Sequence, residues 1–236
     1  MIDIGLLASI AILLTVPTIF LEPWPGHAVD SGVLDISLGA LFIGLAVGRL
    51  TALAIDDPGS LTSVSDVMII RSGVEFWPGL TAGLVWLAIQ ATRNKVPVAV
   101  RLAALVPAGL VAWACYEATC LLRDGCPGPA SSLGLRPDGL ATRMFPIGIA
   151  VAAAAVGTAV VLDRWHRRGL ASRQVVVLAL LAVAGIRALS SIWLPHIGEA
   201  LTRQHRESIV VFAIAVGLLI TLRARDRVTA PTVGAA

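Results

Sequence analysis

The chain has 236 residues, of which 57% are hydrophobic and only 14% are charged, and its formal net charge is +3. Soluble domains carry about 25% charged residues, so this composition excludes an ordinary soluble globular domain. Aromatic residues make up only 5%. The apolar residues are therefore mostly small or aliphatic, as is typical of closely packed membrane helices.

A helix needs about 20 apolar residues to cross a bilayer, and seven segments of the sequence come near this length. In chain order they are residues 4–21, 33–55, 76–91, 98–122, 144–162, 175–194 and 208–222. The first has Asp3 where a signal peptide has basic residues, and no small-residue cleavage site follows it, so we predict a retained helix. We predict an all-α membrane protein of about seven transmembrane helices. Residues 1–228 form a single domain in this prediction, and residues 229–236 form a short disordered cytoplasmic tail.

Basic residues gather after the third, fifth and seventh predicted helices, in segments that lie on one side of the membrane by parity. They are Arg93, Lys95 and Arg101; Arg164, Arg167, Arg168 and Arg173; and Arg223, Arg225 and Arg227. Short basic loops stay in the cytoplasm, so we predict an outward N-terminus and a cytoplasmic C-terminus in the bacterial cytoplasmic (inner) membrane. The loop of residues 22–32, on the same side by parity, has no Lys or Arg. The excess of Arg is an orientation signal in this interpretation, and no nucleic-acid partner is expected.

Three ionisable residues lie inside predicted spans: Arg49, Glu117 and Arg187. Each is about 8–12 Å from the predicted outer end of its helix. Charged groups at such depth normally face the bundle interior and pair with one another. One interpretation is a structural Arg–Glu–Arg network. The other is a cavity in which two arginines receive an anionic headgroup or carboxylate, because one glutamate cannot neutralise both.

The three cysteines are too few for a disulfide scaffold and lack the spacing of metal ligands. Cys120 and Cys126 lie at or beyond the outer end of the fourth predicted helix, where an oxidising environment permits a disulfide between them. Cys115 lies deep in the span, which is typical of a small buried hydrophobic residue. The His and Glu residues of the last outer loop match no metal motif, so we expect neither a metal nor another cofactor.

Several short segments share their order and spacing with a known family. Residues 47–50 (VGRL) are similar to a Gly-Arg-Leu-Gly-Tyr segment, and residues 73–83 (GVEFWPGLTAG) and 101–109 (RLAALVPAG) to the two segments that follow it. Residues 116–128 (YEATCLLRDGCPG) align without gaps on the signature GRIGCFLNGCCYG. Arg187 matches the arginine of a later segment. Over residues 33–220 the chain thus resembles a divergent member of the prolipoprotein diacylglyceryl transferase family.

The resemblance implies an enzyme of lipoprotein biosynthesis. Such an enzyme moves a diacylglyceryl group from phosphatidylglycerol to the cysteine thiol of a lipoprotein precursor, so both molecules are expected partners. It implies substrate binding at four positions: Arg49, Arg187, Gly79 and Gly128. The expected acid/base catalyst is Glu117, which follows from its own carboxylate chemistry and not from the family pattern.

This chain departs from the family pattern at the residues that carry the chemistry. Trp77 stands where the family has a histidine, and Glu117 stands where it has an arginine. Cys120 replaces an asparagine, and Ser191 replaces a glutamate. The resemblance therefore supports the fold and a lipid-facing site better than it supports activity, and Glu117 could serve only as a counter-ion. Two alternatives stay open: a non-catalytic relative that binds anionic lipid or a lipoprotein precursor, and a small-anion transporter. The absence of a clear internal repeat counts against the transporter.

Overall fold

The computed structural model describes residues 33–62, 74–122, 128–136, 141–193 and 201–229, together with six positions between residues 8 and 16. The chain divides into two compact units. Unit 1 is Met1–Leu21 with Leu105–Ala236, and unit 2 is Glu22–Ala104. The single domain predicted over residues 1–228 stays a prediction. Of the two boundaries between the units, the one at Leu105 falls inside the continuous helix Val98–Ala118. Each unit is therefore described by itself.

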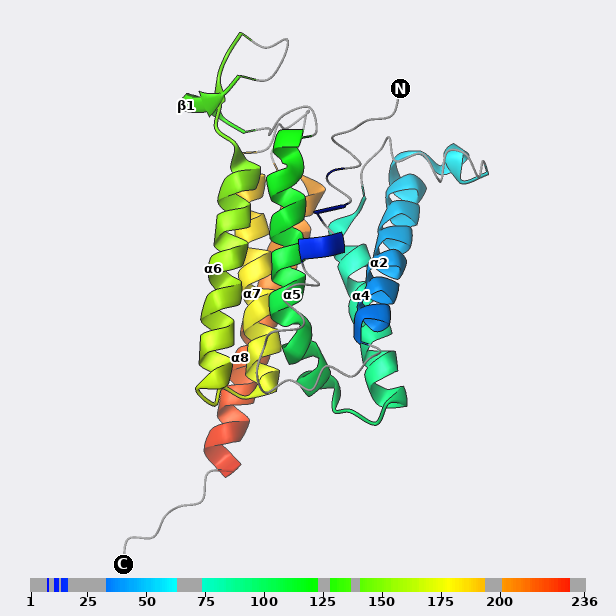
Figure 1. Cartoon of the computed structure of the whole chain (residues 1–236), viewed down its shortest axis with the longest axis vertical. Helices are drawn as coiled ribbons and strands as arrows, with labels where there is room; N and C mark the ends of the chain where they lie inside the picture. Colours follow the sequence, from blue (N-terminus) through cyan, green and yellow to red (C-terminus); the bar gives the residue numbers. More distant parts are fainter. Residues whose placement is uncertain are drawn as a thin grey trace, which may run out of the picture. The chain divides into compact units, whose positions relative to one another are not determined.

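The described part of the chain is mostly helical, as Figure 1 shows. Unit 2 contains α2 (Val33–Asp56), the 3₁₀ helix η1 (Pro58–Thr62) and α4 (Phe76–Arg93). Helix α5 (Val98–Ala118) begins in unit 2 and ends in unit 1, where η2 (Thr119–Leu122) continues it. Unit 1 also contains β1 (Ala130–Leu135), α6 (Ile147–Arg167), α7 (Ser172–Ser191) and α8 (Arg203–Thr229). The predicted tail begins at the last residue of α8, and residues 230–236 lie outside the described residues.

Five helices are long and apolar enough to cross a membrane: α2, α5 continued by η2, α6, α7 and α8. They confirm the prediction of a multi-helix membrane protein. Helix α4 corresponds to the third predicted span, but it has only 18 residues, and Gln90 and Arg93 near its end make it more polar. The first predicted span, residues 4–21, lies mostly outside the described residues. The count of seven spans therefore stays a prediction.

In unit 2, α2 and α4 pack antiparallel through small residues. A Cβ added at Gly79 would lie 2.7 Å from the carbonyl oxygen of Gly44, and one added at Gly83 would lie 3.1 Å from that of Ala40. A Cβ at Gly48 would lie 2.7 Å from the carbonyl oxygen of Glu75. Apolar side chains gain little by leaving lipid, so membrane helices associate where small residues let their backbones approach. The glycines of both helices supply this close approach.

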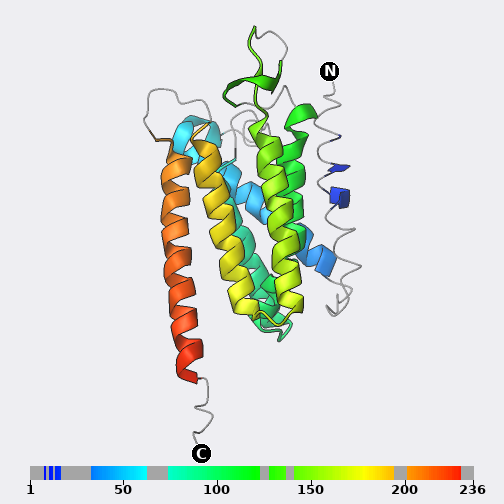
Figure 2. The same cartoon turned by 90° about the vertical axis from the view of Figure 1, so that its left-hand side faces the viewer.

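In unit 1, α5, α6 and α7 share an apolar core. Its buried members come from all three helices and are Leu110, Val111, Ala159, Leu162 and Ala179. A second group, Ala114, Ala152 and Ala155, joins α5 to α6 with side chains no larger than a methyl group. Helix α8 packs on α7, and Figure 2 shows these two helices side by side.

Two predicted helix boundaries in unit 1 are wrong. The fifth predicted helix begins at residue 144, but α6 begins at Ile147. Met144 instead forms bridges with Ala130 and Leu135 of β1, so the outer loop of this all-α prediction contains a short strand. Pro146 caps α6, and a residue that precedes proline favours extended backbone over helix.

The seventh predicted helix, residues 208–222, is longer in the structure. Helix α8 has 27 residues, about 40 Å at 1.5 Å per residue, against about 30 Å for the hydrocarbon core of a bilayer. It runs well past the turn between α6 and α7 (Figure 2). Arg and Gln are good helix formers, so the polar ends of the apolar stretch remain helical.

The turn between α6 and α7 depends on a glycine. Gly169 has φ +99°, and the Leu170 amide donates a hydrogen bond to the Trp165 carbonyl at 3.0 Å across it. Because a Cβ disfavours left-handed backbone, we expect Gly169→Ala to cost about 1 kcal/mol of stability. Thermal unfolding in detergent micelles measures the loss. Gly217→Ala is the control, since Gly217 lies inside α8 with nothing within 4 Å of an added Cβ. Equal effects of the two changes would contradict the prediction.

Candidate functional site

The structure brings Glu117 and Arg187 together in unit 1. Arg187 Nη1 on α7 lies 3.6 Å from Glu117 Oε1 on α5, and their side chains are 12% and 23% exposed, respectively. The indole nitrogen of Trp113 donates a hydrogen bond of 3.0 Å to the same carboxylate oxygen. Trp113 precedes Glu117 by four residues, so it lies one helical turn away on the same face. The carboxylate is thus held between an indole and a guanidinium.

Helix α8 contacts the same guanidinium. When the side-chain amide of Gln204 is flipped, so that its oxygen faces Arg187, this oxygen accepts hydrogen bonds from Arg187 Nη2 and, at 3.0 Å, from Arg187 Nε. A charge-assisted hydrogen bond is typically about 2.7–2.9 Å long, so the 3.6 Å contact with Glu117 is loose by comparison. Arg187 is therefore held more closely by the amide of α8 than by the carboxylate of α5.

A second polar contact joins α7 to α8 beside this pair. Ser191 Oγ lies 2.7 Å from His205 Nδ1, and the two residues are 0% and 9% exposed. Ser191 Oγ also lies 2.9 Å from the carbonyl oxygen of Ala188. The hydroxyl has one hydrogen, so both contacts are satisfied when it donates to that carbonyl and accepts from His205 Nδ1. The two contacts of α8 therefore fall on one face of α7, four residues apart.

These side chains form one group, which we call the Arg187 cluster: Trp113, Glu117, Arg187, Ser191, Gln204 and His205. All of them belong to unit 1. Arg187 precedes the end of α7 by four residues, and Gln204 is the second residue of α8. At 1.5 Å per residue, Arg187 is about 6 Å from the end of its helix, which is shallower than the sequence predicts.

Arg49, the third member of the predicted shared site, lies in unit 2. It is on α2 and is 6% exposed. The preceding residue, Gly48, accepts a backbone hydrogen bond of 3.0 Å from the Glu75 amide, just before α4. The described contacts thus unite Glu117 with Arg187, and the participation of Arg49 in a common site stays a prediction.

The two glycines predicted to bind substrate have close backbone neighbours. Gly79 lies in the interface of α2 and α4, against the carbonyl oxygen of Gly44. A Cβ at Gly128 would collide with the carbonyl oxygen of Phe145, so this loop residue allows the chain to pass close to the start of α6. Packing accounts for both glycines, and their binding of substrate stays a prediction.

Cys115 and Cys120 lie close to Glu117 along α5 and η2. Cys115 is a free thiol, and Cys120 is disulfide-bonded. The predicted partner of Cys120, Cys126, lies outside the described residues. A Cβ at Gly148 would lie 2.7 Å from Cys120 Sγ and 2.7 Å from the Glu117 carbonyl oxygen. Gly148 therefore lets the first turn of α6 pack directly against the turn that carries Glu117.

The contacts that Glu117 makes decide what it can do chemically. Its Oε1 accepts a hydrogen bond from Trp113 and lies 3.6 Å from the Arg187 guanidinium. The cluster therefore holds a carboxylate and a guanidinium side by side. Among the residues that the structure describes, no group of three His, Cys, Asp or Glu side chains is close enough to hold a metal ion.

The sequence interpretation did not include Trp113, Gln204 or His205 in the site. Trp113 could have been found, because a polar indole nitrogen four residues before Glu117 lies on the same helix face. Ser191 follows Arg187 at the same spacing, which marks a polar face on α7. Gln204 and His205 carry no such signal, because α8 meets α7 only in the folded chain.

The transferase resemblance rests on the ordered segments between residues 33 and 220. It therefore remains a prediction about this chain and not a family assignment. No protein-family model matches the chain, and no curated protein gives a significant match.

Proposed function

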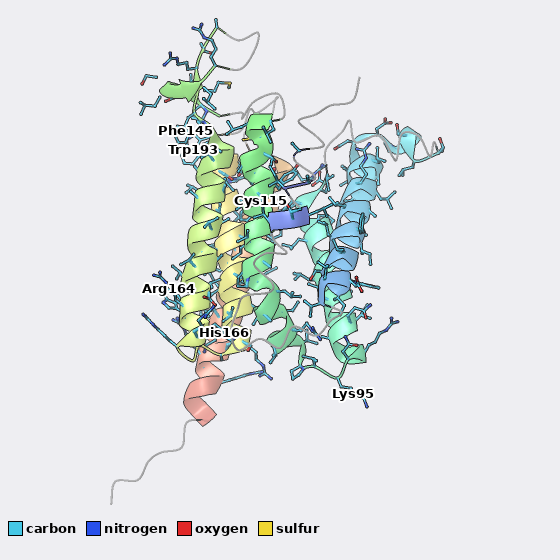
Figure 3. The ribbon with its side chains drawn as sticks, in the orientation of Figure 1. Lys95, Cys115, Phe145, Arg164, His166 and Trp193 are labelled. Carbon is cyan, nitrogen blue, oxygen red and sulfur yellow. The ribbon has the colours of Figure 1, made fainter. Side chains whose placement is uncertain are left out.

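We propose that this chain is a bacterial cytoplasmic-membrane protein that binds the headgroup of an anionic phospholipid, phosphatidylglycerol above all, at the Arg187 cluster. In this proposal seven helices cross the membrane, the N-terminus faces outward and the C-terminus is cytoplasmic. The distribution of side chains within unit 1 supports this orientation. Arg164 and His166 lie at one end of the unit, while Phe145 and Trp193 lie at the other (Figure 3). Basic residues favour the cytoplasmic end of membrane helices.

The observation that carries the proposal is a nearly buried guanidinium beside a cationic helix start. Arg187 is 12% exposed and lies on an apolar helix. Gln204 brings it against the first turn of α8, which contains Arg203 and Arg206 and is followed by Glu207. The N-terminus of a helix is the positive end of its dipole and attracts anions. A lipid phosphodiester fits such a positively charged helix start, and arginine matches its oxygens well.

Transfer of a diacylglyceryl group is the second candidate function. It is favoured by Glu117, a partly exposed carboxylate beside the cation, in addition to the resemblance of the ordered segments. In this reaction Glu117 takes the proton of a cysteine thiol, and the sulfur bonds to the diacylglyceryl carbon. The bond from that carbon to the phosphate oxygen breaks, and glycerol phosphate leaves with its charge balanced by arginine. We place binding first because Trp113 and Arg187 already engage the Glu117 carboxylate.

Lipid binding tests the first candidate. The full chain in detergent micelles should bind short-chain phosphatidylglycerol at least about tenfold more tightly than short-chain phosphatidylcholine. Arg187→Gln should remove this preference, because a charged guanidinium contact contributes about 1.5–3 kcal/mol. Glycerol phosphate and inorganic phosphate serve as competitors, and they show whether the site needs the lipid or only the phosphate. A folded wild-type chain that binds both lipids equally would refute the proposal.

Complementation separates binding from catalysis. The chain is expressed in a bacterium depleted of its own diacylglyceryl transferase, and lipid-modified prolipoprotein is sought on a gel. Modified product that disappears with Glu117→Gln, while phosphatidylglycerol binding persists, would establish the transferase. If a well-expressed, membrane-inserted chain gives no modified product, lipid binding is the function that remains.

A further inference from the structure

The start of α8 meets α7 through two polar contacts that the structure describes. Arg187 and Ser191 lie four residues apart on α7, and Gln204 and His205 are neighbours on α8. Helix α8 packs chiefly on α7 and exposes many large apolar side chains, among them Val210, Ile214 and Ile220. Lipid tails are as apolar as such side chains, so apolar packing alone does little to fix how α8 slides or turns.

We propose that the Ser191–His205 hydrogen bond is a positioning contact that holds Gln204 against Arg187 and thereby keeps the guanidinium available to an anionic headgroup. This inference rests on the function proposed above and names two residues that act through others. Neither residue needs to touch the lipid. Ser191 is fully buried and His205 nearly so, which suits a contact that sets geometry between helices.

The distances show why a shift of α8 changes how strongly Arg187 attracts an external anion. The Gln204 oxygen accepts from one edge of the Arg187 guanidinium, formed by Nε and Nη2, and Glu117 Oε1 lies 3.6 Å from Nη1. A carboxylate attracts a guanidinium more strongly than an amide does, so Gln204 opposes the closing of the Glu117–Arg187 pair. When the first turn of α8 moves away, the pair closes to a shorter ion pair. The cation then interacts more strongly with the Glu117 carboxylate, and its attraction for an external phosphate falls.

Substitutions at the two positions test the proposal in the full chain. We expect Ser191→Ala and His205→Leu each to raise the Kd for short-chain phosphatidylglycerol about fivefold, as the loss of one net hydrogen bond predicts. The double substitution should be no worse than either single one. His205→Asn should restore binding, because its amide reaches the place of Nδ1. Ser190→Ala is the matched control, since the Ser190 hydroxyl donates a hydrogen bond of 3.2 Å to the Arg187 carbonyl oxygen, within α7 itself.

A second measurement needs no lipid and separates this inference from the proposed function. Unfolding in detergent is followed for Ser191→Ala, Gln204→Met and the double variant. If Ser191 positions Gln204, the two changes are not additive, because the first already loosens the contact that the second removes. Additive losses would overturn the positioning role, as would unchanged lipid binding in a folded Ser191→Ala chain. Non-additive losses in a chain that does not distinguish the two lipids would support the positioning role and refute only the lipid-binding function.

Discussion

Gly79→Leu is expected to destabilise unit 2 by about 3 kcal/mol. A Cβ alone at this position would lie 2.7 Å from the Gly44 carbonyl oxygen, and a Cβ at Gly44 would lie 2.9 Å from the Gly79 carbonyl oxygen. Both neighbours are helix backbone, which cannot rotate away as a side chain can. A leucine therefore has to push α2 and α4 apart along the whole interface. Chemical unfolding in detergent, followed by circular dichroism, measures the loss.

Gly157→Leu is the matched control for this prediction. Gly157 lies inside α6, is exposed and has nothing within 4 Å of an added Cβ, so the same change should leave stability nearly unaltered. The comparison also separates packing from substrate binding at Gly79. A Gly79→Leu chain that unfolds like wild type but no longer binds phosphatidylglycerol would show that the glycine serves the ligand and not the helix interface.

Arg187→Met is expected to cost about 2 kcal/mol, because it leaves the Glu117 carboxylate partly buried without its cation. The Trp113 hydrogen bond remains but supplies no charge. Adding Glu117→Gln to the Arg187→Met chain should recover most of the lost stability, because the carboxylate left without its cation is then also removed. The free energies of unfolding of the two single variants and the double variant form the cycle that measures this coupling.

Arg167→Met is the control for burial. Arg167 Nε lies only 2.8 Å from Asp163 Oδ2, but the arginine side chain is 41% exposed. An exposed ion pair contributes about 0–1 kcal/mol, so this substitution should change stability by less than about 0.5 kcal/mol. If Arg167→Met proved as costly as Arg187→Met, distance and not burial would set the energy of these ion pairs. The partly buried Arg187 would then not differ from an exposed arginine.

Together the substitutions at Gly79 and Arg187 assign stability and binding to different parts of the chain. The glycine interface belongs to unit 2 and involves no charge. The Arg187 cluster belongs to unit 1, and α5, α7 and α8 contribute its side chains. Substitutions in the first should change unfolding without changing headgroup preference, whereas substitutions in the second should change both. A change in headgroup preference therefore distinguishes the loss of the proposed lipid site from general destabilisation.

Hydropathy and length were enough to predict the main membrane helices. The start of α2 at Val33 and the apolar span Val98–Leu122 match the prediction residue for residue. Burying backbone in lipid requires every amide to bond within its own helix, so long apolar stretches have little structural choice. The prediction was weakest at polar ends, where α8 continues for several residues beyond its apolar core and β1 delays the start of α6.

Only part of the site could be predicted from the sequence. A Glu and an Arg within apolar spans predict a buried charge pair, because such groups are too costly to leave facing lipid, and the structure brings Glu117 and Arg187 together. It took the folded chain to show that Gln204 shares the guanidinium and that Ser191 meets His205. Short-range spacing reports which residues share a face of one helix. Spacing does not report which face of α8 contacts α7. In lipid, small residues and polar contacts determine how two helices pack, and the apolar pattern does not.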